Sequence, residues 1–294
     1  MQLAAALRPQ DEVAIVAPSG PFDRGSFERG LALVASRYRP VYSDGLFASE
    51  RYLAGSDERR LAELERALAS PTTQAVFCAR GGYGAMRLLS RLRLPESHKL
   101  LIGFSDVTAL HCALQAHHRV SVHGPVVTQL GTLGQAVANE LFDLLEQPDA
   151  RPVLKGTPLV AGVVEGAVVG GNLSVLTRLI GTPFMPPLDR AILLFEDVGE
   201  RPYRLDRMWQ HLSLCGALGR IAGLAVGTFE GCQETEGSWT AEEIIAELAE
   251  EAGLPCVVGL PVGHGEVNRP FPLGARARLD GAAGTLSFLE GAVR

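Results

Sequence analysis

Long apolar runs and clusters of basic residues are missing from this chain of 294 residues. No stretch approaches the roughly 20 apolar residues that a membrane-spanning helix needs. The first nine residues, MQLAAALRP, lack the basic start and long apolar core of a secretory signal. The formal net charge is −6 and the pI is near 5.7, which argues against nucleic acid or an anionic membrane as a partner. We therefore expect a cytoplasmic protein with no membrane and no nucleic-acid partner.

Paired cysteines and metal-ligand spacings are also absent. The seven histidines form no H-E-x-x-H or H-x-H pattern, so the sequence predicts no metal site and gives no indication of another cofactor. The cysteines form no C-x-x-C pair and stand among apolar or small neighbours, which is typical of reduced, mostly buried thiols in the cytosol. They are Cys78, Cys112, Cys215, Cys232 and Cys256.

What the chain does have is a strand and helix alternation in its first half. Hydrophobic residues make up 47% of the sequence, which is ample for a large core and two domains. Residues 12–17, 74–79 and 99–104 are short apolar runs typical of buried strands, and helical periodicity follows in residues 27–37 and 57–69. A further helix, with Met86 and Leu89 on it, is expected after residues 81–84. This order predicts an α/β domain with a parallel sheet covered on both faces.

The second half has a different character. Proline and glycine interrupt the periodicity between residues 147 and 162, so we predict domains at residues 1–150 and 160–294. Short strands punctuated by glycine follow, with helices expected only near residues 173–179, 203–214 and 241–250. These features favour a smaller C-terminal domain of α+β or barrel-like architecture.

Ser105 stands where the third apolar run breaks into a helical pattern. A hydroxyl at such a corner has two interpretations, because it can cap the helix or act as a nucleophile in a cleft. The surrounding residues, Gly103 to Val107, are not G-x-S-x-G because Val107 replaces the second glycine. That difference argues against a standard nucleophile elbow.

An acid and a base occur in comparable settings. Glu196 follows the apolar run at residues 191–195, and His264 is flanked by two glycines, which makes a packed core role less attractive for it. A serine nucleophile needs a base, and the base needs an acid to orient it, so these residues supply the required roles. Three other carboxylates compete for the orienting role, namely Asp197, Glu200 and Asp206.

The loop Gly81-Gly82-Tyr83-Gly84 follows a predicted strand and leaves backbone N–H groups available to an anion. A nucleotide phosphate is one candidate ligand, although the spacing matches neither G-x-G-x-x-G nor a Walker loop. A tetrahedral oxyanion is the other, held by the N–H groups of Gly82 and Asp106. A tight turn accounts for the loop without any ligand.

Five motifs taken together resemble the LD-carboxypeptidases, also called murein tetrapeptide carboxypeptidases. They occur in the family's order and cover nearly the whole chain: residues 81–84, 102–110, 170–173, 194–203 and 263–265. The resemblance implies a serine peptidase with a triad of Ser105, Glu196 and His264. It also implies a serine on the N-terminal α/β domain, an acid and base on the C-terminal domain, and a cytoplasmic homodimer.

The resemblance further implies a substrate. The family removes terminal D-alanine from cell-wall tetrapeptides during recycling, at the bond after the L-centre of a diamino acid. A related branch, the microcin C immunity peptidases, cleaves peptidyl or aminoacyl nucleotide conjugates and is the alternative. A non-catalytic small-molecule binding protein could use the same cleft, but it would not need these three residues beside a glycine loop.

Substrate contacts are the least determined part of the site. An exopeptidase must read the free carboxylate of its substrate, which requires a cation or a backbone nest. Arg80 and Arg269 are candidates for that cation, and Tyr83 and Asn172 are further candidate contacts from the motifs.

Overall fold

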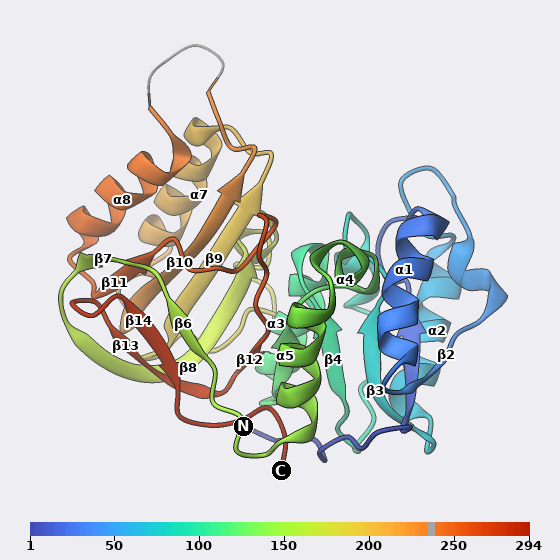
Figure 1. The fold of residues 1–294 in the computed structure, drawn as a ribbon. Helices are drawn as coiled ribbons and strands as arrows, with labels where there is room; N and C mark the ends of the chain where they lie inside the picture. The colour runs from blue at the N-terminus through green and yellow to red at the C-terminus, as the bar shows by residue number, and fades with distance from the viewer. Residues whose placement is uncertain (235–238) are drawn as a thin grey trace.

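The computed structural model describes residues 1–234 and 239–294. They form two lobes, each built on its own sheet, with both termini at the bottom of the view in Figure 1. None of the helices in this described part has the length and apolar character that a bilayer span requires.

The first sheet has six strands in the order β12-β5-β4-β3-β1-β2. Five of them run parallel: β1 Glu12–Val16, β2 Arg39–Val41, β3 Thr73–Cys78, β4 Leu100–Gly103 and β5 Ser121–His123. The sixth, β12 Phe271–Leu273, comes from the C-terminal part of the chain and pairs antiparallel with β5. The domain boundary predicted at residues 150–160 stays a prediction. β12 lies after that boundary in the sequence but belongs to the sheet of the first lobe.

Helices cover both faces of this sheet, as predicted for a parallel sheet. α1 Arg24–Ala35, α4 Val127–Leu133 and α5 Gln135–Glu146 pack on the face that receives Val13 and Ile15. α2 Asp57–Ala69 and α3 Thr108–Ala116 pack on the face that receives Ala14 and Val16. Successive side chains of a strand point to opposite faces, and both faces are covered, so all four apolar residues of β1 are buried.

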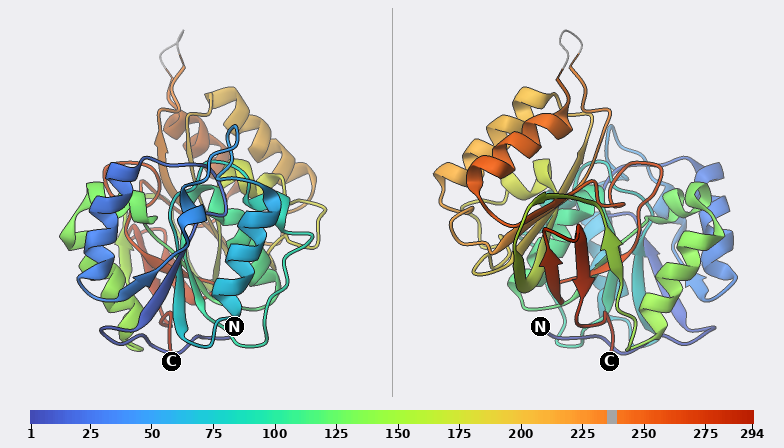
Figure 2. Two further views of the ribbon diagram at one scale, coloured as in Figure 1. Left: turned by 90° about the vertical axis from the view of Figure 1, so that its right-hand side faces the viewer. Right: turned by 60° about the vertical axis from the view of Figure 1, so that its left-hand side comes forward.

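The second sheet has eight strands in the order β6-β14-β13-β8-β9-β10-β11-β7. β8 Val163–Asn172, β9 Ile192–Val198, β10 Gly223–Glu230 and β11 Cys256–Val258 run parallel. β13 Arg276–Asp280, β14 Thr285–Phe288, β6 Val153–Lys155 and β7 Thr157–Val160 add antiparallel pairs. The edge strands β6 and β7 are separated by Gly156 alone, so the sheet must curl to bring its edges together (Figure 2). This confirms the barrel-like alternative.

One apolar core is shared by the two lobes. α6 Leu173–Thr177, α7 Pro202–Leu214 and α8 Ala241–Ala252 lie on the outside of the second sheet, close to the helices that the sequence predicts. Their apolar residues, with Leu193 and Phe195 of β9, join the cluster that also contains α2 and α3. Ile192 and Leu194 point the other way, into a separate core enclosed by the curled sheet. The shared core fixes how the lobes sit relative to each other.

The helix expected after residues 81–84 is a single 3₁₀ turn, Ala85–Leu88. Beyond it, the backbone N–H of Arg93 donates to Glu65 of α2 instead of to a carbonyl of its own segment, at 2.8 Å. Local backbone bonds continue as far as Leu92, whose N–H donates to the carbonyl of Leu88, so the predicted helix is reduced to short turns that end at the bond to Glu65. The structure also adds two features that were not predicted, the pair α4 and α5 and the crossing strand β12.

Candidate active site

Ser105 lies at the carboxyl end of β4, in a strained backbone conformation. Its φ is +64°, a region that residues other than glycine rarely adopt. A 3₁₀ turn, Ser105–Val107, connects it to α3, and its side chain caps neither helix. The hydroxyl oxygen instead lies 3.0 Å from His264 Nε2. The capping interpretation is therefore wrong.

The sharp turn at Ser105 forms without the second glycine of G-x-S-x-G, so the sequence argument against an elbow is corrected. Glycines at two other positions leave room for the close contacts around this turn. A Cβ added to Gly81 would meet Ser105 Cβ at 2.7 Å and its Oγ at 2.8 Å. A Cβ added to Gly103 would meet both Cγ atoms of Val107 at 3.1 Å, so buried Val107 fills the space over that glycine. Gly81 and Gly103 make the close approaches possible.

His264 connects the serine to an acid from the second lobe. Its Nδ1 lies 2.7 Å from Glu196 Oε2, and the Glu196 side chain is fully buried in β9. Gly263 has φ +122°, and a Cβ there would meet Glu196 Oε2 at 2.7 Å, so only glycine lets the acid approach. The imidazole ring also packs on Phe104, with ring centroids 4.7 Å apart. The fold thus joins Ser105, His264 and Glu196 in one chain of hydrogen bonds across the two lobes.

The competing carboxylates have other partners. Asp197 accepts from the backbone N–H groups of Ser174 and Val198, each at 2.8 Å, and so holds the start of α6. Burial raises the pKa of Asp197, and the nearby charge of Glu196 adds to the rise. Glu200 accepts from the Ser174 hydroxyl at 3.2 Å, and Asp206 pairs with Gln210 on α7. None of these three carboxylates has a hydrogen bond to His264.

Asn172 is nearly buried and links the acids. Its amide nitrogen donates to Asp197 Oδ1 at 3.0 Å and to Glu196 Oε1 at 3.4 Å, while its oxygen caps α6 by accepting from Val175 N. Asn172 is paired with Glu196 in the β8 and β9 register, which explains the proximity. The residue predicted as a substrate contact therefore also positions the acid.

The glycine loop lies beside the serine. Gly82 and Gly84 have φ values of +103° and +132°. The carboxylate of Asp106 accepts from Ala85 N at 2.8 Å, and burial raises its pKa although its hydrogen bonds oppose that rise. Behind the loop, the buried guanidinium of Arg60 donates to the carbonyl oxygens of Pro18 and Gly84. The loop is therefore fixed from both sides.

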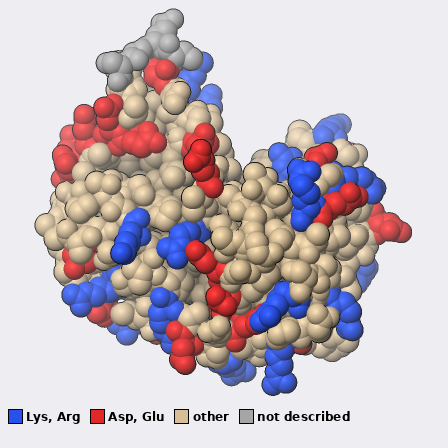
Figure 3. Space-filling model, in the orientation of Figure 1, with Lys and Arg blue, Asp and Glu red and all other residues tan. Residues whose placement is uncertain are grey.

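A pocket of about 290 Å³ opens over Ser105. Gly82, Tyr83, Asp106 and Asn172, all predicted from the sequence, line it with Ser174, Val175, Arg178, Asp197, Val198 and Glu200. Figure 3 shows the molecular surface notched between the two lobes.

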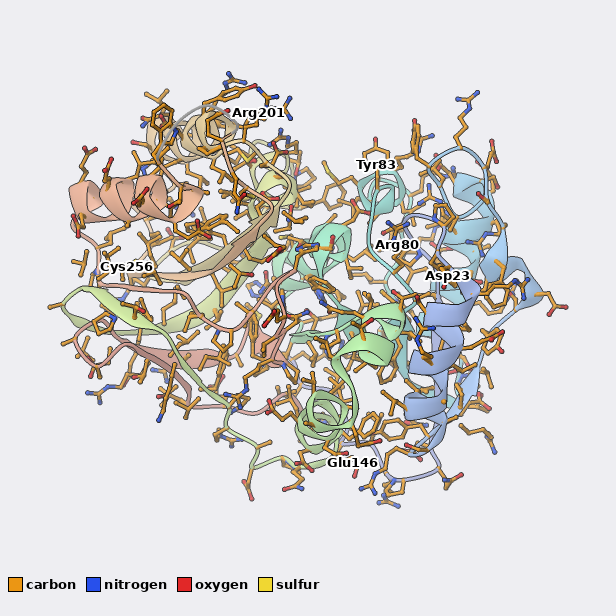
Figure 4. All side chains as sticks on the ribbon, turned by 45° about the horizontal axis from the view of Figure 1, so that its top comes forward. Asp23, Arg80, Tyr83, Glu146, Arg201 and Cys256 are labelled. Atoms are coloured by element: carbon orange, nitrogen blue, oxygen red, sulfur yellow. The ribbon has the colours of Figure 1, made fainter. Side chains whose placement is uncertain are left out.

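The two predicted arginines lie elsewhere. Arg269 Nε donates to Glu140 Oε2 at 2.8 Å and its Nη1 to the carbonyl of Val153, so it ties α5 to the start of β6 and cannot read a substrate in this pocket. Arg80 donates to the carbonyl of Pro21. Figure 4 shows Arg80 and Tyr83 on the N-terminal lobe and Arg201 on the opposite one. Arg178 is the one cation among the described residues that line the pocket, and the sequence reasoning missed it.

Asn268 is a further supporting residue that the sequence did not indicate. It is fully buried, and its Oδ1 accepts from Gly263 N at 3.1 Å and from His123 Nε2 at 3.2 Å. Its amide donates to Gln129 Oε1 at 2.9 Å. Asn268 therefore holds the His264 loop against the first lobe, and its position four residues after the histidine carries no recognisable signal.

Comparisons with known proteins agree with this architecture. Residues 13–124 match the LD-carboxypeptidase N-terminal domain, and residues 165–279 match the LD-carboxypeptidase C-terminal domain. A relative from Synechocystis sp. is 38% identical over 96% of both chains. The murein tetrapeptide carboxypeptidase of Pseudomonas aeruginosa is 37% identical over 80% of this chain and 81% of its own.

Solved structures show the same fold. The crystal structure of a muramoyltetrapeptide carboxypeptidase from Oxalobacter formigenes has a TM-score of 0.84 at 32% identity, covering 94% of this chain and 97% of that one. A structure of MccF in complex with glutamyl sulfamoyl guanosine has a TM-score of 0.91 at 20% identity and covers 99% of each chain. The latter likeness concerns the fold alone. By domain content and by sequence identity over most of its length, the chain belongs to the LD-carboxypeptidase family.

Proposed function

We propose that this protein is a serine carboxypeptidase that releases terminal D-alanine from murein tetrapeptides at the L,D peptide bond. The observation that carries the proposal is the hydrogen-bonded chain from Ser105 through His264 to Glu196, at 3.0 Å and 2.7 Å, beneath an open pocket. Two relatives of the chain, at 37% and 32% identity, bear the names of tetrapeptide carboxypeptidases, which supports the choice of substrate.

The mechanism follows from the positions of the three side chains. His264 Nε2 takes the proton of the Ser105 hydroxyl as its oxygen attacks the scissile carbonyl carbon. Glu196 accepts from Nδ1–H, which fixes the tautomer and stabilises the imidazolium that forms. His264 then gives the proton to the leaving amine of D-alanine and activates the water that hydrolyses the acyl-enzyme. The strained φ of Ser105 supports the assignment, since strain of this kind gathers at functional sites.

The oxyanion is assigned to the backbone N–H groups of Gly82 and Asp106. Both residues line the pocket beside Ser105, and each is next in sequence to one of the two residues, Gly81 and Ser105, that approach each other closely. Backbone donors on a loop that Arg60 and Asp106 hold in place need no rearrangement as negative charge develops.

The choice of a murein peptide over a nucleotide conjugate rests on the relatives. Those named as tetrapeptide carboxypeptidases are 37% and 32% identical to this chain, whereas the MccF structure is 20% identical and shares the fold.

A homodimer and a cytoplasmic recycling role are also proposed, and they rest on the family resemblance. Light scattering of the purified protein across a concentration series tests the dimer. A monomer at every concentration would contradict it.

The direct test is incubation with a murein tetrapeptide, followed by mass spectrometry of the tripeptide and D-alanine. The Ser105→Ala variant is the control. A matched peptide that ends in L-alanine should stay intact. Release of D-alanine by the variant, or no release by the wild type, would contradict the proposal.

A further inference from the structure

His123 is a fully buried histidine at the carboxyl end of β5, beside the strand that leads to the catalytic serine. In the sheet it is paired with Gly103 of β4 on one side and with Phe271 of β12 on the other. Gly103 lies two residues before Ser105, and β12 follows His264 in the chain. The histidine therefore stands between the strand that carries the nucleophile and the segment that follows the base.

The loop of residues 261–269 carries His264 and comes from the second lobe. Nδ1 of His264 is fixed within that lobe, at 2.7 Å from Glu196 Oε2. Ser105 belongs to the first lobe, so the 3.0 Å distance between its hydroxyl oxygen and Nε2 spans the two lobes. That distance therefore depends on contacts that hold the loop against the first lobe, and not on Glu196 alone.

His123 makes one such contact through Asn268, which is also fully buried. Oδ1 of Asn268 accepts from Gly263 N at 3.1 Å and lies 3.2 Å from His123 Nε2. A backbone N–H can only donate, so this atom of Asn268 is the oxygen and Nε2 of His123 must carry the proton. Within the described part of the chain, Nδ1 of His123 has no hydrogen-bond partner, and burial lowers the pKa of the ring to about 3. The imidazole is therefore a neutral donor with a fixed tautomer.

A ring contact gives a second connection between the two histidines. The ring centroid of Phe104 lies 5.8 Å from that of His123 and 4.7 Å from that of His264. On its other side, His123 stacks on Phe271 at 4.7 Å. Neither His123 nor Asn268 is among the described residues that line the catalytic pocket, so their effect on the reaction passes through His264.

We propose that His123 is a positioning residue for the reaction: its Nε2–H bond to Asn268 keeps His264 within reach of the serine. This inference rests on the proposed function and adds a second functional histidine to it. His123 touches no substrate and exchanges no proton. The expected consequence of losing its hydrogen bond is slower turnover with unchanged substrate binding.

Two substitutions separate the hydrogen bond of His123 from the packing of its ring. His123→Phe keeps a flat ring on Phe271 but removes the donor, whereas His123→Gln loses the ring but offers an amide N–H to Asn268. With a murein tetrapeptide as substrate, we expect His123→Phe to lower kcat about tenfold, the equivalent of one hydrogen bond, and to leave KM within about twofold. His123→Gln should keep kcat within about threefold of the wild type.

His98→Phe is the matched control, because it removes another histidine hydrogen bond at the opposite end of the same strand. His98 Nε2 lies 2.8 Å from the carbonyl oxygen of Val120, just before β5. This variant should lose stability in urea unfolding and keep the kcat of the wild type.

A fluorophosphonate gives a readout that needs no peptide. The Ser105 oxygen displaces fluoride from the phosphorus while His264 takes the hydroxyl proton, so the labelling rate reports on this pair of residues. The rate should fall about tenfold in His123→Phe and stay near the wild-type value in His123→Gln. In calorimetry, the affinity of Ser105→Ala for the tetrapeptide should not change when His123→Phe is added.

Wild-type kcat and labelling rate in a folded His123→Phe variant would overturn the positioning role. An equal loss in His123→Gln or in His98→Phe would also overturn it, because packing or general stability would then account for the effect. If His123→Phe does not fold, Asn268→Ala decides: kcat should fall by about tenfold or more, and a rise in KM with unchanged kcat would refute the inference. Failure of the wild type to cleave the peptide, with labelling still slowed in His123→Phe, would instead refute the proposed function alone.

Discussion

Replacing Gly263 by alanine tests whether the contact between Glu196 and His264 controls turnover. A Cβ at this position would lie 2.7 Å from Glu196 Oε2, 2.9 Å from Thr228 Oγ1 and 3.0 Å from Glu196 Cβ. All three distances are shorter than van der Waals contact. Glu196 is fully buried and cannot swing into solvent, so the acid and the histidine loop must separate.

The expected size of the effect follows from these contacts. Alanine at a φ of +122° costs about 1–3 kcal/mol of backbone strain, and the clash adds to it. Relief of a 2.7 Å overlap requires a shift of several tenths of an ångström to about 1 Å, and a displacement of about 1 Å at a catalytic group costs on the order of 10²-fold in rate. We expect kcat to fall about 10²-fold with little change in KM, and the free energy of unfolding to fall by about 2–4 kcal/mol.

Gly265→Ala is the matched control because it lies on the other side of His264. A Cβ there meets Thr228 Oγ1 at 3.4 Å, which that side chain can accommodate, and Gly265 does not need a positive φ. The measurements are D-alanine release at saturating substrate and urea unfolding followed by circular dichroism. A folded Gly263→Ala variant with wild-type kcat would refute the reasoning, and so would an equal loss in Gly265→Ala.

Four further outcomes are expected. Ser105→Ala should lower kcat by several orders of magnitude, since it removes the nucleophile. The free energy of unfolding should stay nearly unchanged, because the hydroxyl caps no helix. Unchanged turnover in the folded variant would remove Ser105 from the mechanism. Glu196→Gln should lower kcat by about 10² to 10⁴ with little effect on KM, and Asp197→Asn by less, since Glu196 is hydrogen-bonded to His264 whereas Asp197 is bonded to the start of α6; the reverse order would mean that the wrong carboxylate was chosen. Burial lowers the pKa of His111 to about 4 and of His123 to about 3 in the folded protein, whereas a histidine in the unfolded chain has a pKa of about 6.5. The unfolded chain therefore binds more protons below about pH 6.5, and the free energy of unfolding should fall as the pH drops from about 6.5 toward 4. His111→Gln should flatten this pH dependence in urea titrations, and an unchanged slope would contradict the assignment. EDTA should leave D-alanine release unchanged, whereas a loss that zinc restores would reveal a metal requirement.

Local patterns in the sequence were enough to indicate the architecture and the chemical groups of the site. The apolar runs before Ser105 and Glu196 encode buried strands, because only a strand covered on both faces is apolar at every position. The helix at Asp57–Ala69 was predicted with its observed bounds, since a charged face opposite Leu61, Leu64 and Leu68 marks amphipathic periodicity. The barrel-like alternative also came from local signals, the short strands punctuated by glycine.

The tertiary structure decided everything that depends on register and on distant partners. A strand places neighbouring side chains on opposite faces, so adjacent Glu196 and Asp197 look equivalent in sequence until the pairing of β8 with β9 and the turn at Gly263 direct one toward His264 and the other toward α6. Arg269 was predicted as a substrate contact, but its partner Glu140 lies 129 residues away and no local pattern reveals it. Residue type and spacing therefore determined which groups are available at this site, whereas long-range packing determined which of them meet.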